Sequence, residues 1–232
     1  MRKAFTVKSS DPSARVARML FLALLVACGP QARAALVLKD PSDPTGYLAR
    51  ILINEAPFPG EMGYVSEENT KAAMLAVLWV LHSRIKHIPP GYSQTQIAAV
   101  KTDKIIDVIT AGGEKGQCDG FYKDKDGRPA MVPRVEQRVR HLLGLANKGT
   151  PGRFARLLSY AQGLAMAYGH GGIEEADRFE SLRVVNTVRV TGRAYSWMTD
   201  LDCYHPGGDF VRIPNDNDGV LGGNRFYTLR KK

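Results

Sequence analysis

The longest apolar helical pattern in the chain runs from Ser66 to about His87. Ser66 is a good N-cap residue, and the two glutamates that follow it favour the start of a helix. The apolar side chains of this helix recur at helical spacing, at Met74, Val77, Leu78, Leu81 and Ile85. A helix of this length with a broad apolar face has to be buried, so the remaining elements are expected to pack around it.

Shorter patterns surround this helix. An apolar helical pattern covers residues 45–55 and is stopped by Pro57. Further helices are predicted over four stretches, residues 94–100, 103–111, 133–147 and 151–168. The stretch "CDGFYKDKDGRPAMV" predicts a β-hairpin that turns at Asp126-Gly127. From about Arg183 onward, valine, threonine and aromatic residues alternate with turn residues, which predicts irregular structure with short strands. The chain shows no repeat or linker, so we expect one α+β domain over residues 40–232.

The N-terminus has the pattern of an export signal. Five basic residues precede the apolar run "MLFLALLVAC", which is too short to span a bilayer and suits a signal peptide. "LVAC" resembles a bacterial lipobox and would make Cys28 a lipidated N-terminus, whereas "ARA" fits a signal peptidase site after Ala34. A buried helix of the fold is the alternative. Residues 1–34 are therefore predicted to be a signal peptide region, and the protein to be exported to the periplasm or cell envelope, with membrane attachment if Cys28 is lipidated.

The cysteine count and the charge agree with export. Either processing route leaves Cys118 and Cys203, which can form a disulfide in an oxidising compartment or remain as two buried thiols. Residues 1–27 hold five basic residues and one acid, so their removal lowers the net charge by four, from +9 to +5. A positive balance suits an anionic partner such as a cell-wall polymer or lipid headgroups. Nucleic acid is not an expected partner, because no basic-aromatic motif appears.

Glu55 stands out because it follows the apolar residues of its helix and precedes the turn Pro57-Phe58-Pro59. The carboxyl end of a helix disfavours negative charge, and burial beside Tyr47 and Phe58 has the same effect. Both raise the pKa of a carboxyl group, and a carboxyl group that is protonated near neutral pH can act as a general acid on a glycosidic bond. The alternative is a glutamate that points to water or pairs with Arg50 or Lys71.

Three stretches of the chain resemble the bacterial cell wall hydrolase family that includes the spore cortex-lytic enzymes. "YLARILINEAPFPGE" with "TKAAMLAVLWVLHSRI" is similar to the opening of that family, "KIIDVITAGGEKGQCDGFY" to its next block, and "GGNRFYTL" to its closing segment. The resemblance implies a mostly helical, lysozyme-like α+β domain that cleaves the glycan strand of peptidoglycan as a muramidase or lytic transglycosylase. The catalytic glutamate of the family falls on Glu55. The sequence departs from the pattern at Ser83, where the family usually has asparagine, in the loop that follows Pro57, and between Lys123 and Arg193.

Other residues are candidates for the same site. A glycosidase with two carboxylates would need a partner for Glu55, for which Glu61 and Asp119 are the candidates, whereas a transglycosylase needs none. Sugar rings stack on aromatic faces, so four aromatic residues are candidates for binding substrate, with the core as their alternative location: Phe121, Tyr122, Tyr195 and Trp197. The histidines are scattered and no phosphate-binding loop is present, so neither a metal nor a cofactor is predicted.

Together with the export signal, the resemblance implies an exported peptidoglycan-cleaving enzyme with a single glutamate as general acid and base. The alternative is a non-catalytic envelope lipoprotein that binds peptidoglycan through the same fold. Whether Glu55 faces a cleft or forms a salt bridge on a closed surface separates the two hypotheses.

Overall fold

The computed structural model describes residues 34–148, 152–179, 194–199, 205–214 and 217–232. The contacts divide the chain into two units, Met1–Ala35 and Leu36–Lys232, and the second unit contains every element described below. Its helices are α2 (Pro44–Glu55), α3 (Glu67–Lys86), α4 (Gln94–Ala98), α5 (Ile105–Ile109), the 3₁₀ turn η1 (Gly113–Lys115), α6 (Pro133–Ala146) and α7 (Arg153–Arg178). Its strands are β1 (Phe121–Lys123), β2 (Pro129–Met131), β3 (Ser196–Thr199), β4 (Phe210–Arg212), β5 (Val220–Leu221) and β6 (Asn224–Leu229). The predicted class, a mostly helical α+β domain, is confirmed.

The ends of α2 and α3 follow from local sequence signals. Asp43 caps α2 by accepting hydrogen bonds from the backbone N–H groups of Thr45 and Gly46, and Pro44 occupies the first turn. Ser66 caps α3, as predicted, by accepting a hydrogen bond from the backbone N–H of Asn69. The helix α2 ends at Glu55, because the extended backbone of Ala56 precedes Pro57.

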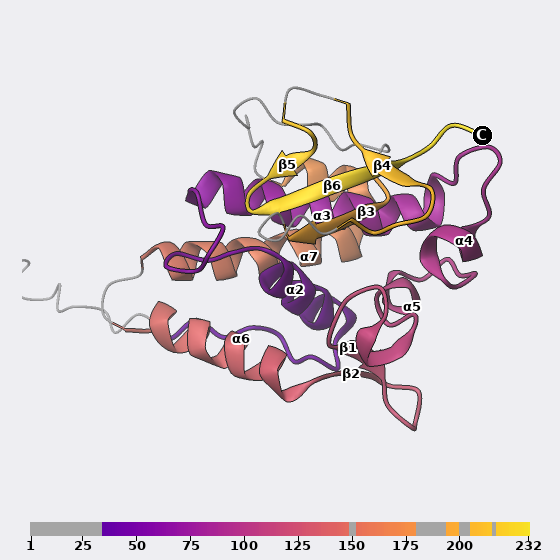
Figure 1. The fold of residues 1–232 in the computed structure, drawn as a ribbon. Helices are drawn as coiled ribbons and strands as arrows, with labels where there is room; N and C mark the ends of the chain where they lie inside the picture. Colours follow the sequence, from indigo (N-terminus) through magenta and orange to yellow (C-terminus); the bar gives the residue numbers. More distant parts are fainter. Residues whose placement is uncertain (1–33, 149–151, 180–193, 200–204, 215–216) are drawn as a thin grey trace, which may run out of the picture. The chain divides into compact units, whose positions relative to one another are not determined.

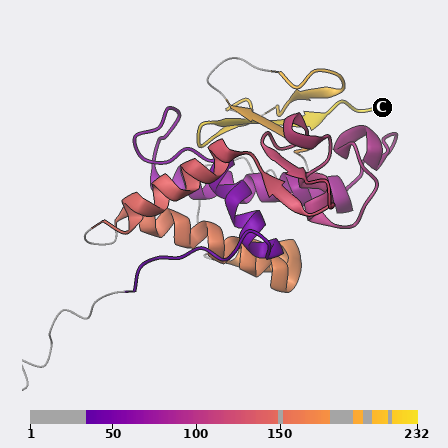
Figure 2. The same cartoon turned by 90° about the horizontal axis from the view of Figure 1, so that it is seen from below.

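The helix α2 lies at the centre of the helical part of the unit. It packs against α3, α6 and α7, and α3 and α6 also contact α7. The two views in Figure 1 and Figure 2 show α2 passing between these longer helices. Tyr47, Ile51 and Leu52 are completely buried there. The apolar face predicted for residues 45–55 is therefore core, and α2 carries its last residue, Glu55, to the edge of that core.

The helix α7 differs from its prediction. We expected a helix to end at Tyr168 before a run of glycines, but α7 continues to Arg178. Gly171 and Gly172 have non-helical backbone angles, so α7 consists of two helical segments joined at a kink, and the predicted end before the glycines falls within a few residues of this break. The segment beyond the kink was not predicted, and its residues Ile173 and Ala176 are completely buried.

The strands form two antiparallel sheets. The strands β1 and β2 make the predicted hairpin, in which Phe121 lies opposite Met131 and Gly127 has a positive φ of 75° in the turn. The C-terminal strands, predicted only as short pieces, pair into a four-stranded sheet in which β6 lies between β3 and β4 and also pairs with β5. This sheet contacts α3 through β3 and β5, so the end of the chain returns to the helices that begin the domain (Figure 1).

Candidate functional site

Glu55 lines a cavity of about 780 Å³. The wall is built from distant segments: the end of α2 and the loop after it, α3, the turn after η1, β3 and the start of β6. Polar and charged residues from these segments include Asn54, Glu55, Glu61, Arg84, Gln117, Asp119, Ser196 and Asn224. The folding of the C-terminal sheet onto α3 thus places residues 196–199 and 224 beside a carboxyl group about 140 to 170 positions earlier in the sequence.

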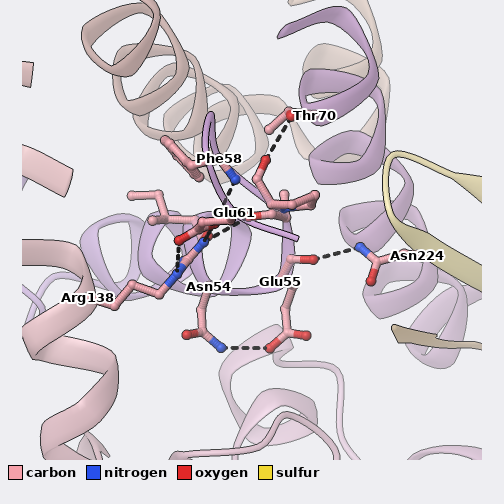
Figure 3. Close-up of polar contacts among 10 residues, drawn as sticks. Asn54, Glu55, Phe58, Glu61, Thr70, Arg138 and Asn224 are labelled. Atoms are coloured by element: carbon pink, nitrogen blue, oxygen red, sulfur yellow. Dashed lines mark hydrogen bonds and ion pairs between the residues drawn. The ribbon is translucent and has the colours of Figure 1, made fainter. Parts of the chain in front are cut away.

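Three hydrogen bonds hold Glu55 in place. The indole Nε1–H of Trp197 donates to one carboxylate oxygen at 2.9 Å, and Nδ2 of Asn54 donates to the other at 3.1 Å. Nδ2 of Asn224 donates to the backbone carbonyl of Glu55 at 2.6 Å and so satisfies a carbonyl that the end of α2 leaves without a helical partner (Figure 3). Because an indole N–H can only donate, Trp197 cannot accept a hydrogen bond from the O–H group of a protonated Glu55.

Burial raises the pKa of the Glu55 carboxyl above its ordinary value, as the sequence predicted. Desolvation is the largest cause, and the hydrogen bonds from Trp197 and Asn54 oppose it only in part. The alternative partners of Glu55 are engaged elsewhere, since Arg50 donates to the backbone carbonyls of Lys39 and Gly46, and Lys71 lies 3.4 Å from Glu67. Within the described residues, Glu55 forms no salt bridge.

The raised pKa predicts how stability depends on pH. The folded state holds the Glu55 proton more tightly than the unfolded state, whose carboxyl has a pKa near 4.5. The stability that Glu55 contributes is therefore complete below that pH and is lost as pH rises through the folded-state pKa. We expect the difference in unfolding free energy between the wild type and Glu55→Gln to fall over this interval by at most about 1.4 kcal/mol per pH unit. Urea unfolding at a series of pH values measures it, and a difference that grows with pH would contradict a raised pKa.

Glu61, a candidate second carboxylate, lines the cavity but forms an ion pair. Its two oxygens accept hydrogen bonds from Nε and Nη2 of Arg138 at 2.9 and 2.5 Å, and one of them also accepts the backbone N–H of Phe58. Arg138 further donates to the backbone carbonyls of Ile53 and Ala56 at the end of α2. Figure 3 shows this pair apart from the Glu55 carboxyl. Glu61 therefore fastens the loop after α2 to α6.

Asp119, the other candidate, also lines the cavity. It lies 2.6 Å from Nη2 of Arg134, and the side chains of both residues are about two-thirds exposed, at 65% and 64%. A pair this exposed contributes little to stability. The negative charge of Asp119 is also one cause, the smallest, of the raised pKa of Glu55.

The two pairs predict different costs of neutralisation. The Glu61 and Arg138 side chains are only 34% and 24% exposed, and Glu61 accepts three hydrogen bonds. We expect Glu61→Gln to lower the unfolding free energy by roughly 1–3 kcal/mol. Asp119→Asn, the matched control, is expected to change it by less than about 0.5 kcal/mol. Urea denaturation of both variants measures the costs, and equal values would show that the pair at Glu61 does not anchor the loop.

The aromatic candidates occupy different environments. Trp197 lines the cavity with 9% of its surface exposed, in contact with Glu55. Phe121 is completely buried against the ring of Tyr47, which corrects its placement in the cleft, because β1 turns its side chain into the core. Tyr195 is also buried, and its hydroxyl donates to the backbone carbonyl of His87. Neither Tyr195 nor Tyr122 lines the cavity.

Several residues of the cavity were not predicted from the sequence. Arg84, near the end of α3, donates from Nε to the backbone carbonyl of Tyr195 at 2.7 Å and places its guanidinium over the ring of Trp197 at 5.3 Å. Asn224 falls in a stretch that only the family resemblance singles out, and His205 is one of the scattered histidines. Helical periodicity carries no signal for these positions, because their neighbours come from distant parts of the chain.

Two of the three cysteines cannot be placed in the structure. Cys28 and Cys203 fall outside the described residues, so lipidation and the Cys118–Cys203 disulfide both stay predictions. Cys118 is a buried free thiol among the described residues. Burial, and secondarily the nearby charge of Glu55, raises the pKa of this thiol, which keeps it protonated. A protonated buried thiol does not act as a nucleophile.

Metal and membrane features were sought in the same ranges. No cluster of three or more histidine, cysteine, aspartate or glutamate side chains in the described part of the chain is arranged to hold a metal ion. None of the helices described there is both long and apolar enough to cross a membrane. A scan against protein-family models, a search of curated proteins and a search of solved structures each found no match to the chain.

Proposed function

We propose that this protein cleaves the glycan strand of peptidoglycan, with Glu55 as general acid and then general base. The observation that carries the proposal is the environment of Glu55: the carboxyl lines a large cavity, its pKa is raised by burial, and it forms no salt bridge among the described residues. A general acid needs a protonated carboxyl group that can reach its substrate, and burial beside a cavity favours both properties. The sequence resemblance supplies the substrate class, and the predicted export would bring the protein to it.

The hydrogen bonds around Glu55 suit both halves of the reaction. Protonated Glu55 would donate its proton to the glycosidic oxygen as the bond from that oxygen to the sugar C1 breaks. The carboxylate left behind would be stabilised by the N–H groups of Trp197 and Asn54, which already point at its two oxygens. This carboxylate would then take a proton from the nucleophile that attacks C1, and the acid would be regenerated.

The nucleophile decides the product. Attack by water gives a reducing end, whereas attack by the O6 hydroxyl of the same muramic residue gives a 1,6-anhydro end and consumes no water. Of the two candidate second carboxylates, Glu61 is held by Arg138, whereas Asp119 forms only an exposed pair with Arg134. We expect the intramolecular route, which needs no second carboxylate, and removal of the Asp119 carboxylate tests this.

Digestion of purified sacculi tests this proposal. We expect the wild type to release soluble fragments that carry anhydro-muramic ends by mass spectrometry, and reducing ends would instead assign a hydrolase. Asp119→Asn, which removes one candidate carboxylate at an exposed pair, is expected to give the same products. Sacculi that retain the protein without being digested would contradict the proposal of an enzyme and support a non-catalytic module that binds peptidoglycan.

A further inference from the structure

Arg84 is a buried cation in the wall of the cavity. Only 3% of its surface is exposed, and Nη1 has no hydrogen-bond partner in the part of the chain that the structure describes. The hydrogen bond to the carbonyl of Tyr195 uses only Nε of the three guanidinium nitrogens. Leaving a charged donor buried and unpaired is costly, so the position is one where a ligand group would find an unmet partner.

The other charges of the cavity do not neutralise Arg84. Among the described acids of the wall, Glu61 pairs with Arg138 and Asp119 pairs with Arg134, and no carboxylate lies within salt-bridge distance of Arg84. Desolvation lowers the pKa of Arg84 to about 10, so the guanidinium is still positively charged at neutral pH. Among the described residues, the cavity therefore contains a positive charge without a counter-ion.

Trp197 connects Arg84 to Glu55. The indole N–H binds the Glu55 carboxylate, while the indole ring lies under the Arg84 guanidinium, with 5.3 Å between the guanidinium carbon and the ring centroid. A ligand that reaches Glu55 is thus also near a cation held by the same indole. Guanidinium groups form strong charge-assisted hydrogen bonds to carboxylates, and because Nε already donates to Tyr195, the Nη atoms of Arg84 are the ones left to donate to such a group.

We infer that Arg84 is a specificity-determining residue that binds a carboxylate of the glycan ligand. This inference rests on the proposed function, because it takes the ligand to be a peptidoglycan strand. Such a strand carries carboxylates in two places, on the lactyl group of the muramic residue and on the stem peptide. Neutral polymers of N-acetylglucosamine lack both, so Arg84 would distinguish peptidoglycan from a neutral polysaccharide with the same backbone.

Binding to defined strands tests the inference. The Glu55→Gln variant serves as the host so that ligands are not cleaved, and Trp79→Phe leaves Trp197 as the single tryptophan reporter. The probes are a peptide-free strand with free lactyl carboxylates, the same strand with those carboxylates reduced to alcohols, and a strand with stem peptides. We expect the acidic peptide-free strand to bind about 10-fold or more tightly than the reduced strand. If the peptide-bearing strand alone is preferred over the reduced strand, the recognised carboxylate is that of the peptide.

Arg84→Gln in the same host should bring the affinities of acidic and reduced strands to within about 3-fold of each other, with little change for the reduced strand. An equal loss for both strands would overturn the inference, because Arg84 would then act only by holding Trp197. Equal affinity for acidic and reduced strands with Arg84 intact would overturn it without any variant at this buried position. Digestion of sacculi by the wild type separates the two proposals. Cleavage without a carboxylate preference defeats only this inference, and an Arg84-dependent preference without cleavage defeats only the enzyme.

Discussion

Glu55→Gln is expected to reduce the rate of glycan-strand cleavage by roughly 10³-fold. The substitution keeps the size of the side chain and removes the proton that would be transferred to the glycosidic oxygen. The backbone carbonyl of residue 55 can still accept the hydrogen bond from Asn224, so the end of α2 should stay in place. The measurement is the initial rate of release of soluble fragments from sacculi, at the pH where the wild type is most active.

Two controls separate chemistry from binding and folding in this variant. Glu55→Gln should still sediment with sacculi and should unfold cooperatively in urea, since the cavity and its neighbours are kept. Glu55→Asp shortens the side chain by one methylene and is expected to be nearly as inactive, because the acid no longer reaches the same position. A Glu55→Gln protein that digests sacculi at close to the wild-type rate would remove Glu55 from the reaction.

Gly222→Ala is expected to lower the unfolding free energy by roughly 3–5 kcal/mol. Gly222 and Gly223 form the two-residue turn between β5 and β6, and both have positive φ angles, of 54° and 79°. A Cβ atom on Gly222 would lie 2.4 Å from the backbone oxygen of Asn69 and 2.9 Å from the Cβ of Ala73, both on α3. Neither neighbour can move without shifting the helix, so the turn would separate from α3.

Gly127→Ala is the matched control for Gly222→Ala. Its φ is also positive, at 75°, but an added Cβ would meet nothing within 4 Å. The strain of the backbone angle alone should cost about 1 kcal/mol. Urea denaturation of both variants isolates the steric part of the effect at Gly222. Equal losses would mean that close packing of Gly222 against α3 does not hold the turn in place. The position of Asn224, which follows the turn and donates to the Glu55 carbonyl, would then need another explanation.

Local signals in the sequence predicted the elements that depend on local chemistry. The Ser66 cap, Pro57 after α2 and the Asp126-Gly127 turn each act on residues within four positions, so their outcome does not depend on the rest of the fold. The second helical segment of α7, beyond Gly171 and Gly172, could not be predicted in this way. Its Ile173 is buried in the core, and the sequence around the glycines contains no sign of that contact.

The residues of the candidate site also differ in whether local sequence or distant contacts determine their positions. Glu55 was a candidate because it ends an apolar helix and because the catalytic glutamate of the similar family falls on it; the local pattern alone left a solvent-exposed or ion-paired glutamate open. Trp197 could be placed only as one of four aromatic candidates, because the pairing of β3 with β6 decides which of them reaches the cavity. Arg84 looked like an ordinary basic residue near a helix end, and its burial against the ring of Trp197 depends on a strand more than a hundred positions later.

The pH dependence of cleavage tests the central claim most directly. Glu55 must be protonated to act as the general acid, so kcat/KM on soluble glycan strands should fall as pH rises through the pKa of its carboxyl group. That pKa is given independently by the pH dependence of stability in wild type and Glu55→Gln, and it should lie above the ordinary value of 4.5. The account predicts that activity falls to half at the pH where the difference in stability stops changing, because both mark the pKa of Glu55 in the folded state. Full activity well above that pH would show that protonated Glu55 is not the acid.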